Sequence, residues 1–570
     1  MTLEAQLPDT SVEESPTIGR ATWISTPERS LLAWYHRPES GEAKGVVVIA
    51  PPIGREQVIS YRTMRILAIM LAEQGWAAVR FSWSHTGESE DLPAGATWTT
   101  EWLKDLETVR TWAANTTGFS DVNAIGLRIG ASLLGDPRVT GFAQRIAWEP
   151  IAGKKFLRQH AALRRLSVPE IPRWDATSEE VIGALLTPEN VADLERIVSP
   201  EPSESGTDGK LIVDKEPDPK VAKGVYAVVS LYARVPPESL QRLIDLLPDA
   251  PQQSLPQWKP ADRARIWVPG FDTDVIEEIV SVGPDHLPAI FTYPLSGART
   301  TEATLMFAAS SEPRDGITGL WVRAARRLAA NGIAVVRSER RGSGDLGRRH
   351  DLVDPNPFSA SAIADAQNTA RWLKEATGAR ITGTGLCAGA WLCGAAAAEA
   401  PIERVLMLNN VAWRTGLGYF EDLYRDLNPE NVLKDIREGE KGEAPRTFKS
   451  KVKELVRNRG GYRLWLALGS LDKVNAPERV LELASRHATL DVYLGEDDFK
   501  LFTFEKGLPG LKRLQRAGRP VTVHRSDPMD HALLAPASRL RALRVIEEYF
   551  GIDTPDIDSA VVQETTKVTV

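Results

Sequence analysis

A strand–turn–helix pattern between residues 380 and 400 constrains the fold of this 570-residue chain more than any other feature. The segment RITGTGLCAGA places Cys387 between Gly385 and Gly389, after a buried strand and before a helix of small residues. Such a turn is strained, and a side chain at either glycine would clash with the neighbouring strand or helix. The turn would hold Cys387 above a sheet, at a helix N-terminus whose dipole favours a thiolate.

The same pattern occurs earlier in the chain, with an arginine in place of the cysteine. Residues 126–131 read GLRIGA and residues 385–390 read GLCAGA, about 259 positions later. Further matches at nearly this spacing are Pro27 with Pro284, Ala50 with Ala309, residues 74–80 with 331–337, Asp105 with Asp365, Trp112 with Trp372, and Gly118 with Gly378. Repeated matches at one offset predict tandem copies of a single domain.

Strands and helices alternate along both copies, which predicts a mostly parallel, doubly wound sheet in each. We expect two α/β domains, at residues 20–275 and 276–552, between a flexible N-terminus at 1–19 and a flexible tail at 553–570. Each copy has an insertion, at about 162–221 and about 413–477, that we expect to form a lid; the alternative is a surface excursion. The polar stretch 199–218 predicts a flexible loop.

Composition excludes several classes of protein. The net charge of −7 argues against general nucleic-acid binding, because no basic excess exists to neutralise phosphates. Cys387 and Cys393 are the two cysteines of the chain, which excludes a disulfide framework and favours a reducing, cytoplasmic location. The acidic N-terminus has no signal-peptide pattern, and we expect no membrane span because no apolar run reaches 18 residues.

Cys387 has candidate catalytic partners in the order nucleophile, acid, histidine. His531 follows the last predicted strand and is the candidate base. The acid should follow the preceding strand, where Asp498 fits best and Asp497 remains nearly as good. Cys393 lies in an apolar helix, off the face of Cys387, and we expect it in the core.

An acyl intermediate on Cys387 would need two preorganised hydrogen-bond donors for its oxyanion. The backbone N–H of Ala388 is the first candidate, and Ser310 or Ser311 in the loop after the strand at 303–309 supplies the second. Arg340 or Arg341, after the next strand, either touches an anionic substrate or lies in a solvated turn.

The first copy lacks these groups. Arg128 stands at the nucleophile position, and arginine cannot be deprotonated in a protein. A strand at 265–268 is followed almost directly by the second copy, so the final strand and histidine loop are expected to be lost. Pro51 and Pro52 remove backbone donors from the corresponding oxyanion loop. We expect a catalytically dead domain in which Arg128 either binds an anion or, as we favour, pairs with a carboxylate such as Glu56.

Over nearly its whole length the chain resembles the α/β-hydrolase superfamily. The segments APPIGRE (50–56), FSWSHTGES (81–89), AWEPIAGKKFLRQ (147–159) and YFEDLYRDLNPENVLKDIREGE (419–440) look like hydrolases associated with exosortase and exopolysaccharide gene clusters. The resemblance implies two α/β-hydrolase-like domains, triad roles for Cys387, His531 and Asp498 or Asp497, and a link to surface polysaccharide. A cysteine nucleophile is also similar to that of dienelactone hydrolases, and it favours thioester or acyl-transfer chemistry.

These observations predict an acyl hydrolase or acyltransferase of the ester or thioester class, acting through an acyl-cysteine in the second domain. The substrate would be a small-molecule or carrier-bound acyl group, and homo-oligomerisation is left open. We expect no metal and no organic cofactor, because the sequence has neither metal-ligand spacing nor a phosphate-binding glycine loop. The alternative is a non-catalytic ligand-binding or scaffold protein built from two hydrolase folds.

Overall fold

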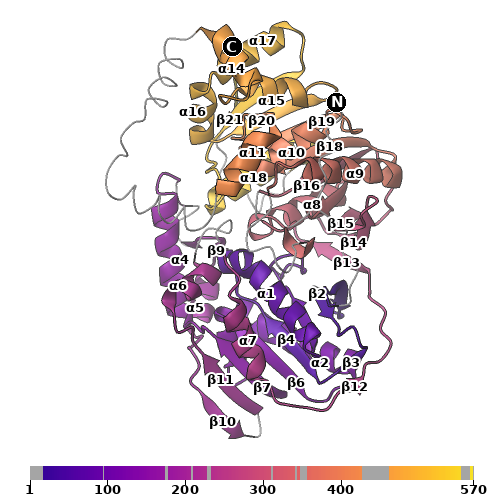
Figure 1. Ribbon diagram of the computed structural model, residues 1–570, viewed down its shortest axis with the longest axis vertical. Coiled ribbons are helices and arrows are strands. Elements are labelled where there is room, and N and C mark those ends of the chain that lie inside the picture. The colour runs from indigo at the N-terminus through magenta and orange to yellow at the C-terminus, as the bar shows by residue number, and fades with distance from the viewer. Residues whose placement is uncertain are drawn as a thin grey trace.

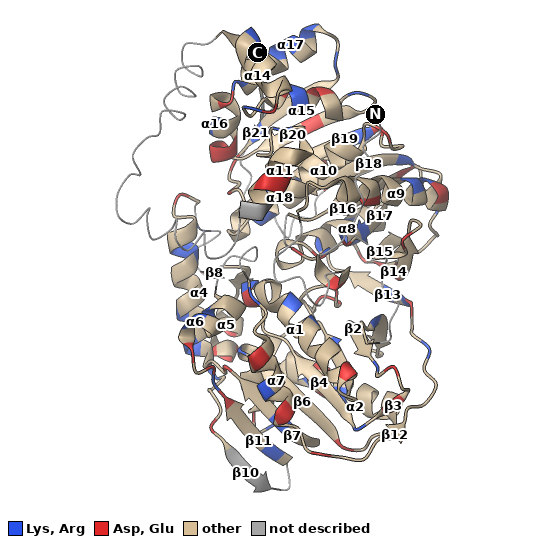
Figure 2. Ribbon diagram, in the orientation of Figure 1, with Lys and Arg blue, Asp and Glu red and all other residues tan. Residues whose placement is uncertain are grey.

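The computed structural model describes residues 17–93, 95–171, 173, 178–206, 209–227, 233–309, 312–340, 343–346, 356–426, 461–553 and 565–568. Figure 1 shows two α/β halves, with the N-terminal half below and the C-terminal half above. Acidic and basic residues are interspersed over the helices and loops of both halves in this view (Figure 2). No helix among the described residues is both long and apolar enough to cross a membrane.

The first sheet is mostly parallel and has helices on both faces. Its described strands lie in the order β1 (Arg20–Ser25), β2 (Ser30–His36), β5 (Ala77–Phe81), β4 (Val46–Ala50), β6 (Val122–Leu127), β7 (Phe142–Trp148), β11 (Gly209–Asp214) and β10 (Ser203–Gly206). The accompanying helices are α1 (Arg55–Glu73), α2 (Trp98–Thr117), α3 (Ile129–Leu134), α4 (Gly153–Ser167), α5 (Pro188–Glu195), α6 (Pro219–Tyr226) and α7 (Pro237–Asp245).

Strand β4 shows why this sheet has helices on both sides. Val46 and Val48 belong to the core cluster that contains α2, whereas Val47 and Ile49 belong to the cluster that contains α1. Successive side chains of a strand point to opposite faces, so an unbroken apolar run requires cover on both. Short elements complete this half: β3 (Glu42–Ala43) pairs with β12 (Gln253–Ser254), and β8 (Glu179–Val181) pairs with β9 (Ala184–Leu186).

The second sheet repeats this arrangement and extends it at both edges. Its described strands lie in the order β13 (Arg263–Val268), β14 (Thr273–Val282), β15 (Leu287–Pro294), β17 (Ala334–Ser338), β16 (Glu302–Phe307), β18 (Arg380–Leu386), β19 (Arg404–Leu408), β20 (Thr489–Leu494), β21 (Val521–Ser526) and β22 (Thr565–Lys567). Its helices are α8 (Leu320–Ala330), α9 (Ala360–Thr377), α10 (Ala388–Ala396), α11 (Leu417–Asp426), α14 (Tyr462–Ser470), α15 (Pro477–Ala484), α16 (Glu496–Phe504), α17 (Gly507–Arg516) and α18 (Pro536–Tyr549), with short 3₁₀ turns at Ile317–Gly319 and Gly344–Leu346.

Corresponding elements of the two halves have the same geometry. In the first sheet, β6 leads into the turn at Arg128 and lies between β4 and β7. In the second sheet, β18 leads into the turn at Cys387 and lies between the corresponding strands, β16 and β19. Helices α2 and α9 both end at a glycine in the left-handed conformation, Gly118 with φ 78° and Gly378 with φ 73°. The predicted fold class is confirmed in its architecture: two α/β domains, each with a mostly parallel, doubly wound sheet.

The structure corrects the expected alignment and the expected end of the first copy. Ala50 pairs with Gly126 and Phe307 pairs with Gly385, so the structural counterpart of Ala50 is Phe307 and not Ala309. The strand assigned to the end of the first copy is β13, which pairs antiparallel with β14 in the second sheet. The expected boundary between residues 275 and 276 therefore falls inside β14.

Two segments expected to be flexible contain sheet strands. Within the polar stretch 199–218, β11 pairs with β7 and β10 pairs with β11, and Leu211 of β11 is buried. Within the tail 553–570, β22 pairs antiparallel with β21. At the other end, Thr17 is buried and its carbonyl oxygen accepts a hydrogen bond from His36 Nδ1. Residues 1–16 and most of the second insertion, 427–460, lie outside the described residues.

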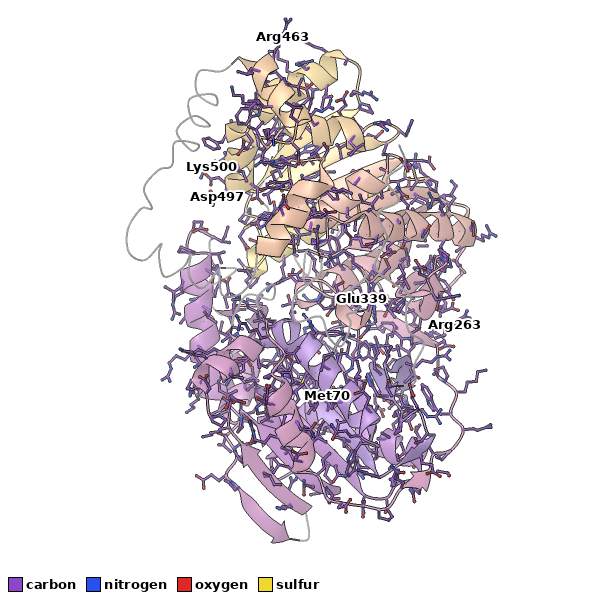
Figure 3. The ribbon with its side chains drawn as sticks, viewed as in Figure 1. Met70, Arg263, Glu339, Arg463, Asp497 and Lys500 are labelled. Carbon is purple, nitrogen blue, oxygen red and sulfur yellow. The ribbon has the colours of Figure 1, made fainter. Side chains whose placement is uncertain are left out.

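Buried ion pairs join the two halves. Arg314 of the second half donates to Glu88 of the first (Nη2–Oε2, 2.7 Å), and Arg80 of the first half donates to Asp345 of the second (2.9 Å). All four side chains are at most 10% exposed. A mixed apolar cluster lies beside them, in which Trp23 of β1 packs with Ile266 of β13. Figure 3 labels Glu339, which accepts from Arg314 at this boundary. The two halves are thus joined by buried polar and apolar contacts along this boundary.

Candidate active site

Cys387 lies at the turn between β18 and α10. Its backbone has φ 52° and ψ −114°, and backbone strain of this kind costs about 1–3 kcal/mol where the surroundings impose it. A Cβ on Gly385 would collide with the backbone of Gly389, and a Cβ on Gly389 would collide with the carbonyl oxygen of Phe307. Both glycines are needed for α10 to pack against β16 and β18, which leaves Cys387 partly exposed at the start of the helix.

Arg128 has the same strained backbone in the first sheet. Its φ of 57° and ψ of −117° match those of Cys387 within a few degrees. A Cβ on Gly126 would lie 2.8 Å from the backbone nitrogen of Ala131, and a Cβ on Gly130 would collide with the carbonyl oxygen of Ala50. The turn is therefore built in the same way in both sheets, with an arginine or a cysteine at its apex.

His531 and Asp498 come together beyond the ends of two neighbouring parallel strands. His531 lies in the loop between β21 and α18, and its Nδ1 donates to Asp498 Oδ2 over 2.9 Å. Asp498 is in the first turn of α16, directly after β20, and is 6% exposed. The His531 side chain is 42% exposed, and Cys387 lies near enough to raise the pKa of its ring. The three groups are therefore neighbours.

Asp497, which the sequence left open as the acid, lies elsewhere. Its side chain is 75% exposed and accepts from Lys500 Nζ over 3.0 Å. Figure 3 labels both residues on the outer side of α16. Consecutive residues of a helix point in directions about 100° apart, so one of the two carboxylates faces His531 and the other faces solvent.

The surroundings of His531 favour its charged form. Burial lowers the pKa of the ring, but the hydrogen bond to Asp498 and the interaction with Cys387, together with the charges of these groups, outweigh it and raise the pKa to about 11. An imidazolium next to Cys387 is the arrangement that stabilises a thiolate nucleophile. Cys393 is fully buried, and burial raises the pKa of its thiol far above the usual range, as expected for a core residue.

Asn409 joins the two loops that carry the acid and the base, and the sequence analysis missed it. Its Oδ1 accepts from the backbone N–H of Gly495 (2.9 Å), and its Nδ2 donates to the carbonyl oxygens of Asp530 (2.9 Å) and His531 (3.2 Å). The side chain is fully buried, and the backbone has φ 46°. A polar Asn-Asn pair directly after the apolar strand at 404–408 was the available signal.

Glu312 and Arg340 place a buried carboxyl group and a buried guanidinium group near the same centre. Burial raises the pKa of Glu312 to about 7, against the opposing charges of Arg340 and His531. Its Oε2 has no hydrogen-bond partner among the described residues. Arg340 is 3% exposed and donates to the carbonyl oxygen of Ala309 (3.2 Å), so it is not in a solvated turn.

The predicted oxyanion-hole residues are only partly described. Ala388 is the first residue of α10, whose first backbone N–H groups have no partner within the helix. Ser310, Ser311 and Arg341 lie outside the described residues. No group of three or more potential metal ligands occurs in the described ranges.

In the first sheet, the side chain at the apex of the turn, Arg128, is engaged in a buried ion pair. Arg128 donates to both carboxylate oxygens of Glu56 over 2.9–3.1 Å, and His160 Nε2 lies 3.2 Å from Glu56 Oε1. The ring of Tyr226 lies 3.9 Å from the guanidinium carbon of Arg128. The structural pair with Glu56 is therefore present, as favoured, and the Arg128 side chain is buried.

Comparisons with known proteins add little to this geometry. No protein-family model and no curated protein matches the chain. A dienelactone hydrolase from Anabaena variabilis is 15% identical with a TM-score of 0.31, and the match covers 49% of this chain and 97% of that one. TT1662 from Thermus thermophilus (15%, TM-score 0.30, 49% and 99%) and the esterase Est22 (14%, TM-score 0.30, 50% and 80%) are similar to the same extent. At these scores none of the likenesses bears on activity.

Proposed function

We propose that the second domain is an acyl hydrolase or acyltransferase of the ester or thioester class, with Cys387 as nucleophile, His531 as acid and base, and Asp498 as the group that orients His531. The observation that carries the proposal is the hydrogen bond between Asp498 and His531, together with a Cys387 close enough to raise the pKa of His531. A nucleophile, a base within reach and a third group that fixes the base are the elements of covalent acyl transfer.

The reaction begins with a thiolate and an imidazolium. The Cys387 thiolate attacks the carbonyl carbon of the acyl donor, and the negative charge moves to the carbonyl oxygen, next to the N-terminus of α10 and the N–H of Ala388. As the tetrahedral intermediate collapses, the bond to the leaving alkoxide or thiolate breaks, and His531 gives that group its proton. An acyl-Cys387 and a neutral His531 remain.

The second half returns the enzyme to its starting state. Neutral His531 takes a proton from water, or from another acceptor, and the resulting nucleophile attacks the acyl-cysteine. Collapse of this intermediate expels the Cys387 thiolate and leaves His531 protonated. Asp498 keeps Nδ1 as the protonated nitrogen throughout, so Nε2 is the atom that carries the proton in both halves.

We propose further that the domain formed around the first sheet is a pseudoenzyme that supports the second. Arg128 cannot act as a nucleophile, and Glu56 already pairs with it. His160 is the one histidine between Arg128 and the second sheet, and it lies against the same carboxylate. The buried ion pairs between the two domains support a role for the first domain in stabilising the fold of the second.

Intact-protein mass spectrometry tests the proposal. The wild type, Cys387→Ala and Cys393→Ala are exposed to a panel of activated esters and acyl thioesters. A mass increase on the wild type and on Cys393→Ala, mapped to Cys387 and absent from Cys387→Ala, is the expected result. Decay of the adduct in water alone identifies a hydrolase, and decay only with a nucleophilic acceptor identifies a transferase. No adduct with any donor would overturn the proposal in favour of a non-catalytic binding or scaffold protein.

A further inference from the structure

A cavity of about 460 Å³ lies between the two domains, away from the proposed catalytic groups. Its described lining includes none of Cys387, His531 and Arg128. The wall comes from α1, α2, α4 and the β8–β9 hairpin on one side, and from α8 and α18 on the other. Figure 1 shows α1 and α8 on opposite sides of the boundary between the halves. The volume falls within the range of about 300–1,000 Å³ typical of small-molecule sites.

Most of the wall is apolar. Trp102, Phe156 and Leu194 line it from the first domain and are almost completely buried, and Leu320 and Leu540 line it from the second. Such a surface takes an aliphatic or aromatic body, because transfer of apolar groups from water to this wall is favourable.

Two arginines from facing helices of the second domain give this apolar cavity a positive end. Arg323 of α8 makes no hydrogen bond or ion pair with any described residue. Arg539 of α18 uses Nη1 for the carbonyl oxygens of Leu533 (3.1 Å) and Leu534 (2.9 Å). Burial and then the charge of Arg323 lower the pKa of Arg539 to about 10, so the two cations are close enough to repel one another.

The other charged groups of the wall mostly have counterions. Arg326 pairs with Glu277 (2.8 Å), Arg327 with Glu547 (2.9 Å), and Asp91 with His85 (2.9 Å). Burial and the neighbouring carboxylates raise the pKa of Asp315 well above its usual range. The charge of Asp91 reaches Arg323, and the charges of Asp530 and Glu180 reach Arg539, but neither guanidinium makes an ion pair with a described carboxylate. The two side chains open to an anion are therefore Arg323 and Arg539.

We infer that this cavity binds an amphipathic monocarboxylate, with its apolar chain against Trp102, Phe156 and Leu194 and its carboxylate on Arg323 and Arg539. One anion would relieve the repulsion between the two guanidinium groups and give Arg323 the ion-pair partner that it lacks among the described residues. The ligand would contact both domains at once. The inference does not depend on chemistry at Cys387, and binding can be measured whether or not an acyl-enzyme is found.

Titration calorimetry of the full-length Cys387→Ala protein with decanoate tests the inference. We expect saturable binding of one decanoate per chain, and much weaker binding of 1-decanol, which has the same chain length without the charge, and of acetate, which has the charge without the chain. Arg323→Gln should weaken decanoate binding by about tenfold or more, the usual effect of losing a charged hydrogen-bond partner.

Matched variants separate this cavity from any other site. Arg463→Gln removes the same charge from an exposed position at the far end of the second domain, labelled in Figure 3, and should leave binding unchanged. Arg323→Lys should retain part of the affinity, and Leu540→Trp, which fills the cavity, should abolish binding. Equal affinity of the wild type and Arg323→Gln, equal affinity for decanoate and 1-decanol, or no saturable binding would each overturn the inference.

Discussion

Asn409 and Glu149 occupy equivalent positions in the two sheets, and each stabilises the chain where it leaves its strand. Each directly follows a strand, has positive φ (46° and 49°), and donates its backbone N–H to the neighbouring strand, at Tyr493 O and Asp214 O respectively. Each side chain accepts a backbone N–H from the following loop, Asn409 from Gly495 and Glu149 from Glu216. Of the two side chains, only that of Asn409 also has N–H groups to donate. These bind the loop that carries His531, a loop without a counterpart in the described part of the first domain.

This difference predicts that Asn409→Asp slows acylation of Cys387 by about 10- to 100-fold, because the acceptor is kept while both bonds to the His531 loop are lost. Stopped-flow acylation with an activated thioester measures the rate, and the pH profile of the rate should change as well, since His531 moves relative to Asp498. Glu149→Gln, which keeps the acceptor in the first domain, is the control and should acylate at the wild-type rate. An unchanged rate in Asn409→Asp would show that the amide has no positioning role.

The two neighbouring carboxylates should differ sharply when neutralised. Asp498→Asn removes the acceptor that fixes the His531 tautomer, and losses on the order of 10³–10⁴-fold in the acylation rate are expected for such a change. Asp497→Asn breaks only an exposed pair with Lys500 and should leave the rate within about twofold of the wild type. Comparable losses in the two variants would contradict the assignment of Asp498.

Stability should depend on pH through His531. Its pKa of about 11 in the folded protein lies above the ordinary value of about 6.5, so the folded state binds this proton more tightly than the unfolded state does. The stabilisation is complete below about pH 6.5 and is lost as the pH rises toward 11. The difference in free energy of unfolding between the wild type and His531→Gln, measured by urea denaturation, should therefore shrink between about pH 7 and pH 11. A difference that is constant over this range would refute the elevated pKa.

The boundary between the domains should be sensitive to loss of a buried charge. Glu88→Gln removes the closest carboxylate from the Arg314 guanidinium, while Glu339 and Asp345 remain, and the loss of one charged hydrogen-bond partner costs about 1.5–3 kcal/mol. Chemical denaturation followed by tryptophan fluorescence and by circular dichroism gives the free energy of unfolding. Glu107→Gln, which breaks an exposed pair with Arg110, should cost no more than about 1 kcal/mol. If Glu88→Gln were as mild as Glu107→Gln, the ion pairs would not hold the domains together.

The strand–turn–helix at Cys387 and its counterpart at Arg128 were readable from the sequence because the constraint is local. A Cβ on Gly385 or Gly126 would collide with backbone a few residues later in the same turn, and these are the local collisions. A Cβ on Gly389 or Gly130 would instead collide with the neighbouring strand, at Phe307 or Ala50. Continuous apolar runs such as β4 likewise encode burial on both faces without reference to the rest of the chain.

Tertiary structure alone decided which residues meet. The sequence favoured Asp498 but left Asp497 open as the acid, and the orientation of α16 relative to the β21–α18 loop selects Asp498. β13 and β22 joined the second sheet, and β11 joined the first, because sheet edges accept any strand whose backbone groups can pair, whatever its hydrophobic pattern. Arg314 and Glu88 are 226 residues apart in the chain, and no local pattern encodes a contact that forms only when two complete domains pack.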